Sequence, residues 1–506
     1  MRTIVVGAGS AGAVVAARLT EDERHEVVLV EAGPDYVRAH EGELPEDLKN
    51  GRRNSMRRHD WGQAYKATSH KLWSALTMAF PRGRVVGGSS AVNTCIALRG
   101  QPADFDEWAA LGLPEWSWEH CLPAFKKLET DLDFDNEWHG RSGPIPIRRH
   151  TADELVPWQT AFLEGCEELG FPKCNDTNDP TTTGSGPHAM NKIDGERMSA
   201  ARTYLGATTR ARKNLTITAD TLVRRVRFIN KRVQGVEVER HGHVFRIDAD
   251  RVVLAGGATA TPGILLRSGV GPRDEIARLG VELIAHVPGV GARLLDHPGV
   301  AIFFWPHTRG FASIDDPIIQ TVHRYTAEGS DCPNDMQIQP GSFIPLPGYA
   351  IPATVISACL GKVRGTGTIR LRSARASDAP ILETNFLSDP EDEKRLHEAL
   401  RTIARLAETK AIKKVARAVY PFRPFESGGL RGALAQITGS GYHPSGTVPM
   451  GPDSDELAAT DGRGRVRGVE GLFVVDASLM PTITSANTNL PTLMMGERFG
   501  AWLKDT

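Results

Sequence analysis

At the start of the chain, short apolar runs alternate with a glycine-rich turn. Residues 3–6 (Thr-Ile-Val-Val) predict a buried parallel strand, and the small apolar residues of 10–20 predict a helix. Between them stands Gly-Ala-Gly-Ser-Ala-Gly at 7–12. A second apolar run, 26–31, predicts another strand and ends in a carboxylate 24 positions after the first glycine. This order of elements predicts a dinucleotide-binding unit.

Each residue type in this unit has a physical role toward a dinucleotide. The glycines allow a tight turn, the approach of backbone to a pyrophosphate and close packing of helix on strand, and the helix N-terminus offers amides to the phosphates. The carboxylate is expected to accept hydrogen bonds from the adenosine ribose. An ordinary glycine-rich turn is the alternative, and the unit alone leaves NAD and FAD open. The candidate cofactor residues here are Gly7, Gly9, Ser10, Ala11, Gly12, Glu31 and Ala32.

The following stretch, residues 34–81, is polar and irregular and shows no clear apolar period. We expect a covering loop or lid with short helices, because long irregular loops in compact domains are commonly functional. A basic cluster within it favours a solvated surface over a binding role. The cluster consists of Arg52, Arg53, Arg57 and Arg58.

Farther along, several short runs alternate apolar and polar residues, which predicts the strands of an antiparallel meander. These runs are 215–217, 223–229, 232–239 and 244–247, and they lead into 251–257, a buried strand that ends in glycines. The region from 300 to 431 mixes strands with a long predicted helix at 390–410 and carries no phosphate-binding signature. It is therefore the expected substrate-covering domain.

Composition removes several classes of function. Among the 506 residues, 60 Lys and Arg balance 61 Asp and Glu, so binding to nucleic acid or anionic lipid through net charge is not expected. The six cysteines are scattered without a C-x-x-C pair, which argues against a disulfide framework, a zinc site or a redox dithiol. The N-terminus shows no secretion signal, and no apolar run approaches the roughly 20 residues of a membrane span. We expect a cytoplasmic protein with no metal and no membrane association, as a monomer or small homo-oligomer.

Four further stretches resemble, in order, the signatures of the glucose-methanol-choline (GMC) family of flavoprotein oxidoreductases. The resemblance covers nearly the whole chain. The stretches are 83–93 (Gly-Arg-Val-Val-Gly-Gly-Ser-Ser-Ala-Val-Asn), the glycine-rich 257–271, 291–298 with its Asp-His-Pro ending, and a C-terminal set at 442–446 (Tyr-His-Pro-Ser-Gly), 475–478 (Val-Asp-Ala-Ser) and 487–492 (Asn-Thr-Asn-Leu-Pro-Thr).

The resemblance implies a mixed α/β fold, in which a Rossmann-like FAD-binding domain is joined to a substrate-binding domain with an antiparallel sheet. Both domains are expected to be discontinuous in sequence. The FAD-binding domain is expected over 1–155, 190–300 and 432–506, with the 34–81 lid in its first segment, and the substrate-binding domain over 156–189 and 301–431.

The resemblance also implies how FAD is held. Glycines and serines of the first signature would supply unshielded amides and small hydroxyls to the flavin and its phosphates. Some relatives carry a histidine just before the signature's asparagine and bind FAD covalently through it, but Val92 stands there in this chain, so FAD is expected to be non-covalent. The implied FAD contacts of this signature are Arg84, Val86, Gly87, Gly88, Ser89, Asn93, Thr94, Cys95 and Ile96.

Farther along the chain, a C-terminal helix at 492–503 would direct its N-terminal amides at the flavin edge that becomes negative on reduction. The remaining implied FAD contacts are Val223, Ala255, Gly256, Tyr442, Asp476, Ala477, Asn487, Pro491 and Thr492.

His443 and Asn487 are the implied catalytic pair. An alcohol cannot lose hydride easily while its oxygen keeps its proton, so a base is needed, and neutral imidazole, with an ordinary pKa near 6.5, serves at neutral pH. Asn487 would donate an amide hydrogen to the same oxygen. Many relatives have a second histidine at this position. On sequence alone a single histidine is more often structural than catalytic, and the surrounding resemblance reverses that judgement.

The implied function is FAD-dependent oxidation of an alcohol to an aldehyde or ketone, with hydride passing to flavin N5 and electrons then passing to O2, giving H2O2, or to another acceptor. Primary aromatic or furanic and aliphatic alcohols are favoured, and the sequence shows no carboxylate cluster that would demand choline. The alternatives are a hydroxynitrile lyase with structural FAD, a sugar or glycoside oxidase, and a light-driven fatty-acid decarboxylase, whose branch lacks the base histidine. Possible substrate-pocket residues are Phe304, Trp305, Gln337, Gln339, Phe343 and Ile344, with core packing the better expectation for most of the apolar ones.

Overall fold

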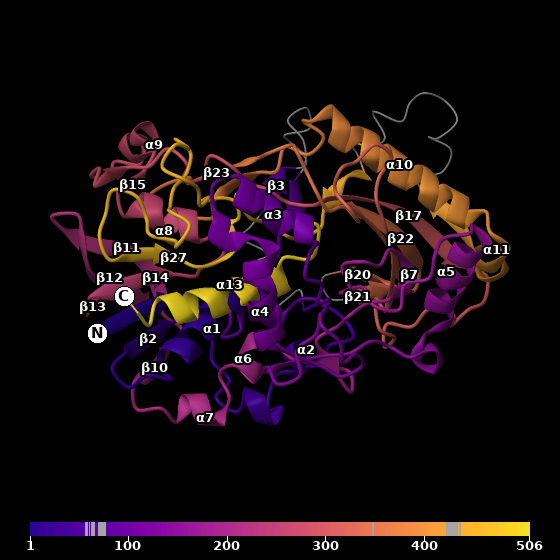
Figure 1. The fold of residues 1–506 in the computed structure, drawn as a ribbon, viewed down its shortest axis with the longest axis horizontal. Helices are drawn as coiled ribbons and strands as arrows, with labels where there is room; N and C mark the ends of the chain where they lie inside the picture. Colours follow the sequence, from indigo (N-terminus) through magenta and orange to yellow (C-terminus); the bar gives the residue numbers. More distant parts are fainter. Residues whose placement is uncertain are drawn as a thin grey trace.

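The computed structural model describes residues 1–506 except 56–58, 60, 62–65, 69–76, 347–348, 421–433, 435–436 and 506. Two layered halves lie along the long axis of the molecule: a parallel sheet with its helices in one, and a large antiparallel sheet with its helices in the other (Figure 1). This is the mixed α/β architecture that the sequence predicts. Within the described residues, no helix is both long enough and apolar enough to cross a membrane.

The parallel sheet contains the predicted dinucleotide unit. Its strands, in spatial order, are β10 (Leu215–Thr218), β2 (Glu26–Val30), β1 (Arg2–Val6), β14 (Arg251–Leu254) and β27 (Leu472–Val474), and every neighbouring pair is parallel. After their first residue, β1 and β2 are buried throughout, as expected of strands covered on both faces.

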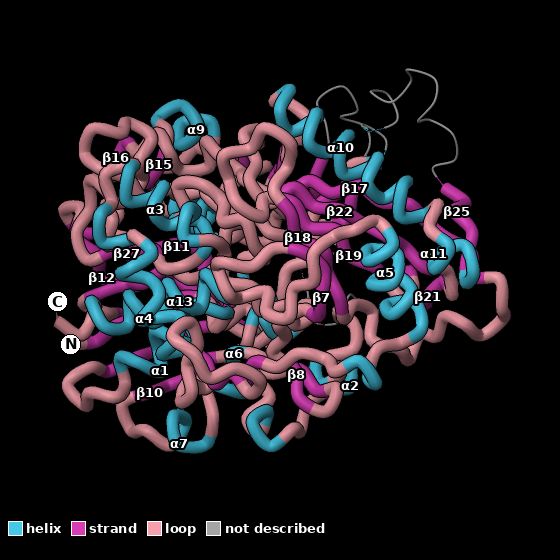
Figure 2. Tube along the Cα trace, turned by 45° about the vertical axis from the view of Figure 1, so that its right-hand side comes forward, coloured by secondary structure: helices cyan, strands magenta, loops and turns pink. Residues whose placement is uncertain are grey.

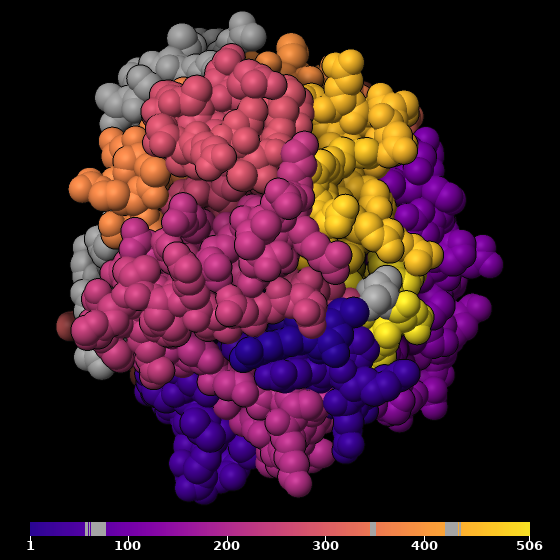
Figure 3. Space-filling view, turned by 90° about the vertical axis from the view of Figure 1, so that its left-hand side faces the viewer, coloured from indigo at the N-terminus to yellow at the C-terminus, as the bar shows by residue number. Residues whose placement is uncertain are grey.

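Two helices from opposite ends of the sequence pack together on this sheet. They are α1 (Ser10–Leu19) and α13 (Asn489–Trp502). A Cβ added to Gly496 would lie 2.8 Å from the Cβ of Val14, so the two helices approach closely because of the glycine. Figure 3 shows the N-terminal segments, in indigo, beside the C-terminal ones, in yellow.

The structure corrects the predicted meander at its first strand. Residues 215–217 form β10, which pairs in parallel with β2 in the dinucleotide sheet. The antiparallel sheet next to it consists of β11 (Leu222–Ile229), β12 (Arg232–Arg240) and β13 (His243–Asp248). A four-residue alternating run shows that one face is buried but contains no information about the direction of its partner.

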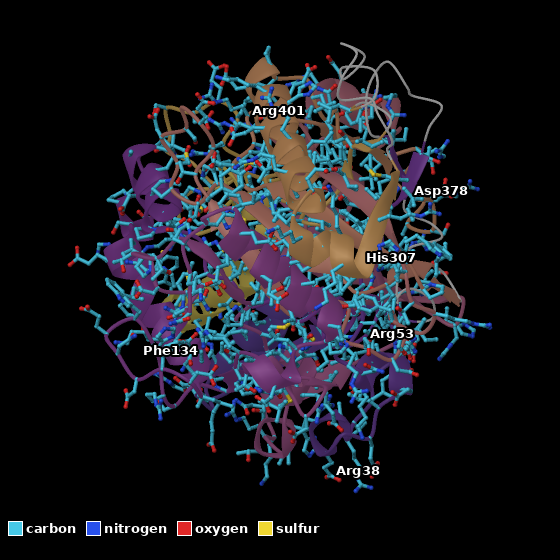
Figure 4. The ribbon with its side chains drawn as sticks, turned by 90° about the vertical axis from the view of Figure 1, so that its right-hand side faces the viewer. Arg38, Arg53, Phe134, His307, Asp378 and Arg401 are labelled. Atoms are coloured by element: carbon cyan, nitrogen blue, oxygen red, sulfur yellow. The ribbon has the colours of Figure 1, made fainter. Side chains whose placement is uncertain are left out.

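The antiparallel sheet of the other half has seven strands. In spatial order they are β25 (Ala416–Tyr420), β17 (Pro298–Pro306), β22 (Thr354–Leu360), β19 (Met336–Gly341), β18 (Thr321–Tyr325) and β7 (Gly184–Pro187), with β26 (Gly439–Ser440) also paired to β17. The helices α5 (Pro157–Glu168), α10 (Pro390–Ala407) and α11 (Lys410–Val415) pack on this sheet (Figure 2). In Figure 4, Arg401 marks α10 and His307 marks the end of β17.

Strand periodicity divides the side chains of this sheet between two faces. Val300, Ile302, Ile338 and Ile356 belong to the core that lies under the helices. The residues between them in sequence therefore point to the opposite face. In register, Gln337 stands opposite Cys359, and Gln339 opposite Ser357. This second face lies toward the parallel-sheet half.

The long helix predicted at 390–410 is present as α10 but is three residues shorter, and a second helix follows it. α10 ends at Ala407, and α11 begins at Lys410. The break follows from Thr409, whose hydroxyl oxygen accepts a hydrogen bond from the amide of Ile412 and so begins a new helix.

The stretch 34–81 contains strands as well as the expected short helices. The 3-10 helix η1 (Ala39–Glu41) and α2 (Glu46–Lys49) come first. β3 (Lys66–Thr68) and β4 (Thr77–Ala79) then extend β23 (Thr368–Arg370) and β24 (Ile381–Glu383) into a four-stranded sheet. Arg57 and Arg58 of the basic cluster lie outside the described residues.

The remaining elements connect these layers, and the domain boundaries stated above stay a prediction. These elements are η3 (Gly88–Ala91), α3 (Pro102–Ala110), η4 (Pro114–Trp116), α4 (Trp118–Leu128), β5 (Glu129–Asp131), β6 (Ile145–Ile147), η5 (Ala152–Glu154), β8 (Lys192–Ile193), β9 (Glu196–Arg197), α6 (Ala200–Thr203), α7 (Ala207–Arg210), α8 (Thr261–Arg267), β15 (Val270–Gly271), α9 (Arg273–Arg278), β16 (Ala285–His286), β20 (Ile344–Leu346), β21 (Tyr349–Ile351) and η6 (Ala477–Leu479).

Candidate active site

A cavity of about 620 Å³ lies between the parallel and the antiparallel sheet. The glycine turn after β1, the loop after β14 and the first turn of α13 line one part of it, and β17, β19 and β22 line another. Most of the residues expected to bind the cofactor or to react line this single cavity. They are Gly7, Gly9, Ser10, Ala11, Glu31, Ala32, Gly88, Ser89, Asn93, Thr94, Ile96, Val223, Ala255, Gly256, Tyr442, His443, Asp476, Ala477, Asn487 and Thr492.

The other expected residues are not among those that line the cavity. They are Gly12, Arg84, Val86, Gly87, Cys95 and Pro491. A Cβ on Gly12 would lie 1.9 Å from the carbonyl oxygen of Gly7, so the third glycine allows α1 to begin against β1. Gly7 itself has φ +97°, which favours glycine. The glycine turn therefore exposes its amides because no side chain fits there.

The two helix N-termini at the cavity wall suit an anionic ligand. α13 begins at Asn489, three residues before the predicted start, so Pro491 and Thr492 lie in its first turn, where proline is tolerated. The hydroxyl of Ser10, at the start of α1, donates to Oδ1 of Asn489 at 2.7 Å. The positive ends of two helix dipoles therefore meet at one place.

Two buried polar atoms around the start of α13 have no hydrogen-bond partner within the described part of the chain. They are Nδ2 of Asn489 and Oδ1 of Asn487, and both residues line the cavity. An unsatisfied buried polar group costs about 1–3 kcal/mol, so these atoms indicate a polar ligand. Together with the glycine turn and the helix termini, the residues present fit a dinucleotide such as FAD.

The carboxylate of Glu31 is held by backbone amides at the end of β2. It accepts hydrogen bonds from Ala8 at 2.9 Å and from Gly33 at 3.0 Å. Burial raises the pKa of Glu31 to about 7, against the effect of these amides. Each carboxylate oxygen can accept more than one hydrogen bond, so Glu31, which lines the cavity, keeps acceptor capacity for the ribose contact expected of it.

Asp476 organises the loop that follows β14. Its carboxylate accepts hydrogen bonds from the amide of Gly257 at 2.9 Å, the hydroxyl of Thr261 at 2.6 Å and the amide of Ser478 at 2.8 Å. Burial raises the pKa of Asp476, and these donors oppose the rise. The side chain expected to contact FAD thus also fixes the first turn of α8.

The structure brings the expected catalytic pair together across 44 positions of sequence. Nδ2 of Asn487 lies 3.0 Å from Nε2 of His443 at the cavity wall. Loss of solvation lowers the pKa of His443 well below its ordinary value, and the neighbouring His297 and Arg82 add to the effect. The imidazole is therefore neutral at pH 7, the state that a general base requires.

His297 determines which nitrogen of His443 carries the hydrogen. A carbonyl only accepts, so Nε2 of His297, 3.0 Å from the carbonyl oxygen of Thr484, carries the hydrogen of the neutral His297 ring. Its Nδ1 is then an acceptor for the hydrogen on Nδ1 of His443, at 2.9 Å. Burial lowers the pKa of His297 to about 4, which keeps it neutral. Nε2 of His443 is consequently the unprotonated nitrogen, and it faces the cavity.

Asp296 holds both imidazole-bearing segments. Its carboxylate accepts hydrogen bonds from the amides of His297 at 2.9 Å and His443 at 2.7 Å, and from the hydroxyl of Ser440. Burial raises the pKa of Asp296 to about 6. Asp296 and His297 belong to the Asp-His-Pro stretch of the third signature, to which sequence reasoning attached no role. A histidine and a carboxylate next to each other in that signature were the available signal.

The pocket residues proposed from sequence divide into two groups. Gln337, Gln339 and Phe343 line the cavity. Phe304 belongs instead to the core under the helices, where its ring packs on Trp158, because its strand position points away from the cavity. Trp305 is half-exposed on the surface. Neither these two nor Ile344 is among the described cavity-lining residues.

A second cluster of ionisable residues lies apart from the cavity and is balanced by arginines. Glu129, Asp131 and His139 offer ligand atoms within 4.8 Å of one another. Arg99 pairs with Glu129, and Arg149 with Asp131 at 2.9 Å. Although burial opposes it, the surrounding carboxylates raise the pKa of His139 to about 10, so its ring is a cation as well. The negative charge of this cluster is accounted for by protein groups.

Two sequence-family models, both described as GMC oxidoreductase, match the chain, one over residues 1–299 and the other over 363–496. The chain belongs to the GMC oxidoreductase family. It is therefore an FAD-dependent oxidoreductase of the kind that acts on CH–OH donors.

Relatives and solved structures agree with this membership. The chain is 33% identical to 5-(hydroxymethyl)furfural oxidase from Methylovorus sp. (strain MP688), over 98% of this chain and 97% of that protein. It is 34% identical to mitochondrial choline dehydrogenase from Homo sapiens, over 98% and 88%. The crystal structure of pyridoxine 4-oxidase from Mesorbium loti superposes with a TM-score of 0.91 at 28% identity, over 100% and 99%. The GMC fold predicted from the sequence motifs is thereby confirmed.

Proposed function

We propose that this GMC oxidoreductase oxidises a neutral primary alcohol to the aldehyde, with Nε2 of His443 as the base. The observation that supports this most directly is the pair formed by His443 and Asn487 at 3.0 Å, with the tautomer of His443 set by His297. FAD, when bound, supplies the hydride acceptor. Every proton movement is then left to groups of the chain itself.

The two side chains of the pair contact different atoms of the alcohol group. The substrate hydroxyl would replace their mutual hydrogen bond: its hydrogen donates to Nε2 of His443, while its oxygen accepts from Nδ2 of Asn487. As the proton moves to Nε2, the ring becomes an imidazolium whose Nδ1–H donates to neutral His297. A hydrogen bond to a charged group is stronger than one between neutral groups, so this contact gains strength as the charge forms.

The charge of the cavity supports an uncharged substrate. Of the residues described at its wall, the carboxylates are Glu31, Asp378 and Asp476. Glu31 and Asp476 lie at the ends of the parallel strands, and Asp378 accepts hydrogen bonds from Ser373 and Arg375. Asp296 lies beside His443, but its carboxylate accepts hydrogen bonds from the protein and is not among the described cavity-lining residues. The cavity wall described beside the catalytic pair therefore offers no carboxylate to a quaternary ammonium, which favours neutral alcohols such as the furanic one named for the relative from Methylovorus.

Two finer points of the proposal concern the flavin. Val92 offers no nucleophile where covalently flavinylated relatives have histidine, so FAD is held non-covalently, and acid or detergent should release it. Two similar proteins, 5-(hydroxymethyl)furfural oxidase and pyridoxine 4-oxidase, are named as oxidases, so O2 is the proposed acceptor, with H2O2 as product.

The test is anaerobic mixing of the FAD-loaded enzyme with 5-(hydroxymethyl)furfural, benzyl alcohol or choline, followed by absorbance of the flavin. The two neutral alcohols should bleach it, and choline should not. His443→Ala should keep FAD and lose about 10²-fold or more in the bleaching rate, the size of a general-base contribution. His243→Ala is the matched control, since His243 is exposed on β13. Cyanohydrin cleavage without bleaching would instead identify a lyase, and bleaching at the parent rate in His443→Ala would remove that residue from the mechanism.

A further inference from the structure

Besides the catalytic pair, the cavity wall carries two glutamines of β19, Gln337 and Gln339. They are two residues apart on one strand, so both side chains point to the same face. That face is the one away from the helices, because the intervening Ile338 belongs to the core under the helices. Both glutamines line the cavity that contains the catalytic pair.

The two amide groups differ in their hydrogen bonding. Gln337 donates one hydrogen of Nε2 to the carbonyl oxygen of Ser485 at 3.1 Å, so this amide is anchored to the protein. Gln339 contacts Nε2 of His188 through Oε1, at 3.3 Å. Its Nε2 has no hydrogen-bond partner within the described part of the chain. Both hydrogens of the Gln339 amide are therefore left for a ligand.

His188 determines the orientation of the Gln339 amide. The ring of His188 is fully buried, and burial lowers its pKa to about 3, so it is neutral and carries one hydrogen. Its Nδ1 has no partner among the described residues. If the hydrogen were on Nδ1, a buried N–H would be left unpaired, which is rarer and more costly than an unpaired acceptor. The hydrogen is therefore on Nε2, Oε1 of Gln339 accepts it, and Nε2 of Gln339 faces the cavity.

The strand register places this donor at a distance from the chemistry. Gln337 contacts Ser485, two residues before Asn487, and its partner across the sheet, Cys359, stands opposite Gly299, two residues after His297. Gln339 is one two-residue step farther along β19, about 6.8 Å by strand geometry. The side chains of Val355 and Phe343 line the cavity beyond it. The donor therefore faces the end of the substrate that is remote from the alcohol, beside the apolar side chains of Val355 and Phe343 and the hydroxyl of Ser357.

We propose that Gln339, oriented by His188, is a substrate-binding residue that donates a hydrogen bond to an acceptor at the far end of the substrate. The preferred substrates are then bifunctional: a primary alcohol at one end, an apolar body, and an uncharged carbonyl-type acceptor at the other. The role of Gln339 rests on the proposed alcohol oxidation. It goes beyond that oxidation because it assigns substrate preference to two residues outside the catalytic pair.

The experiment compares two near-isosteric alcohols, 4-acetylbenzyl alcohol and 4-isopropylbenzyl alcohol, which differ in the remote acceptor. The FAD-loaded parent should prefer the acetyl compound by about 5- to 50-fold in kcat/KM, mainly through KM, the range of one hydrogen bond in a partly desolvated site. Gln339→Leu should remove the preference. His188→Leu should reduce it, and His188→Gln, whose amide nitrogen can take the place of Nε2, should restore it. FAD content and thermal unfolding report whether each variant folds.

A binding measurement separates this inference from the proposed function. 4-Methylacetophenone and 4-isopropyltoluene lack the hydroxyl and can be titrated into each variant by calorimetry or flavin difference absorbance. If neither alcohol is oxidised but the parent binds the ketone more tightly and Gln339→Leu does not, alcohol oxidation is wrong and the role of Gln339 stands. If the parent shows no preference in turnover or binding, or if Gln339→Leu keeps the preference, the assignment of Gln339 is wrong.

Discussion

Removing the acceptor behind the base should slow the enzyme without removing the base. In the structure, Nδ1 of His297 accepts the Nδ1 hydrogen of His443 at 2.9 Å, and Nε2 of His297 is anchored on the carbonyl oxygen of Thr484 at 3.0 Å. His297→Leu deletes both contacts. His443 then has no acceptor for its Nδ1 hydrogen when it becomes a cation, and its tautomer is no longer determined. The variant therefore tests the tautomer argument on which the proposed mechanism depends.

The magnitude follows from the charge that develops on the ring. A hydrogen bond to a charged group contributes about 1.5–3 kcal/mol, and each 1.36 kcal/mol corresponds to a factor of ten in rate, so the loss should be about 10- to 150-fold in the rate of flavin reduction. Repulsion between the two rings does not offset this loss, because the pKa of His297, lowered to about 4, leaves it neutral at pH 7.

The assay is anaerobic stopped-flow reduction at saturating alcohol, from pH 5 to 9, with FAD content and thermal unfolding measured on the same samples. His297→Asn is the matched control, because its Oδ1 can stand near the position of Nδ1 and accept from His443. It should recover a large part of the rate. Reduction of the leucine variant at the parent rate, with FAD bound, would refute the reasoning. Equal losses in the leucine and asparagine variants would show that His297 acts through packing alone.

Three further predictions follow from the same cavity. His443 is a base only when neutral, and its pKa lies below 6.5, so the rate of flavin reduction by the parent should rise with pH through one midpoint below 6.5 and stay level above pH 7. A midpoint above 7 would contradict the argument that burial lowers this pKa. Asn487→Ala should lower the reduction rate by about 10- to 150-fold, because it loses one hydrogen bond to a partly charged oxygen, and its pH midpoint should move little. Asn487→His should retain activity, and an alanine variant as fast as the parent would show that the Asn487 side chain is merely structural. Gly12→Ala should lose FAD and unfold at a lower temperature, because the added Cβ would lie 1.9 Å from the carbonyl oxygen of Gly7. Gly206→Ala, whose Cβ meets nothing nearer than 4.0 Å, should behave as the parent, and equal FAD content in the two variants would contradict the close approach.

Local sequence determined the dinucleotide half of the molecule. Its strand, glycine turn, helix and second strand are contiguous, and each is specified by residues close to one another: the buried apolar runs of β1 and β2, the positive φ of Gly7 and the small residues of α1. Residues within about thirty positions of one another therefore specify the unit, while β14 and α13 complete its packing. The same locality explains why the GMC signatures, each a short continuous stretch, predicted the family, and why most of the cofactor and catalytic residues that they imply line the cavity.

Long-range packing decided what short patterns leave open. β10 has the alternation of a meander strand, and only its neighbour β2 made it a parallel strand. Phe304 and Gln339 are both plausible pocket residues by composition, yet strand parity sends one into the core under α10 and the other to the cavity. A short run of residues shows neither which strand will pair with it nor which of its two faces will point into the core.

The chemistry of the base was decided at the tertiary level as well. His443 is predicted from its signature, but the nitrogen that accepts the proton depends on His297, 146 positions away, and on the carbonyl oxygen of Thr484 behind it. The lowered pKa of His443 arises from the protein that surrounds it and not from its sequence neighbours. A histidine's type can be read from sequence, whereas its tautomer and its affinity for a proton are properties of the packed environment, because desolvation and hydrogen bonding act through space.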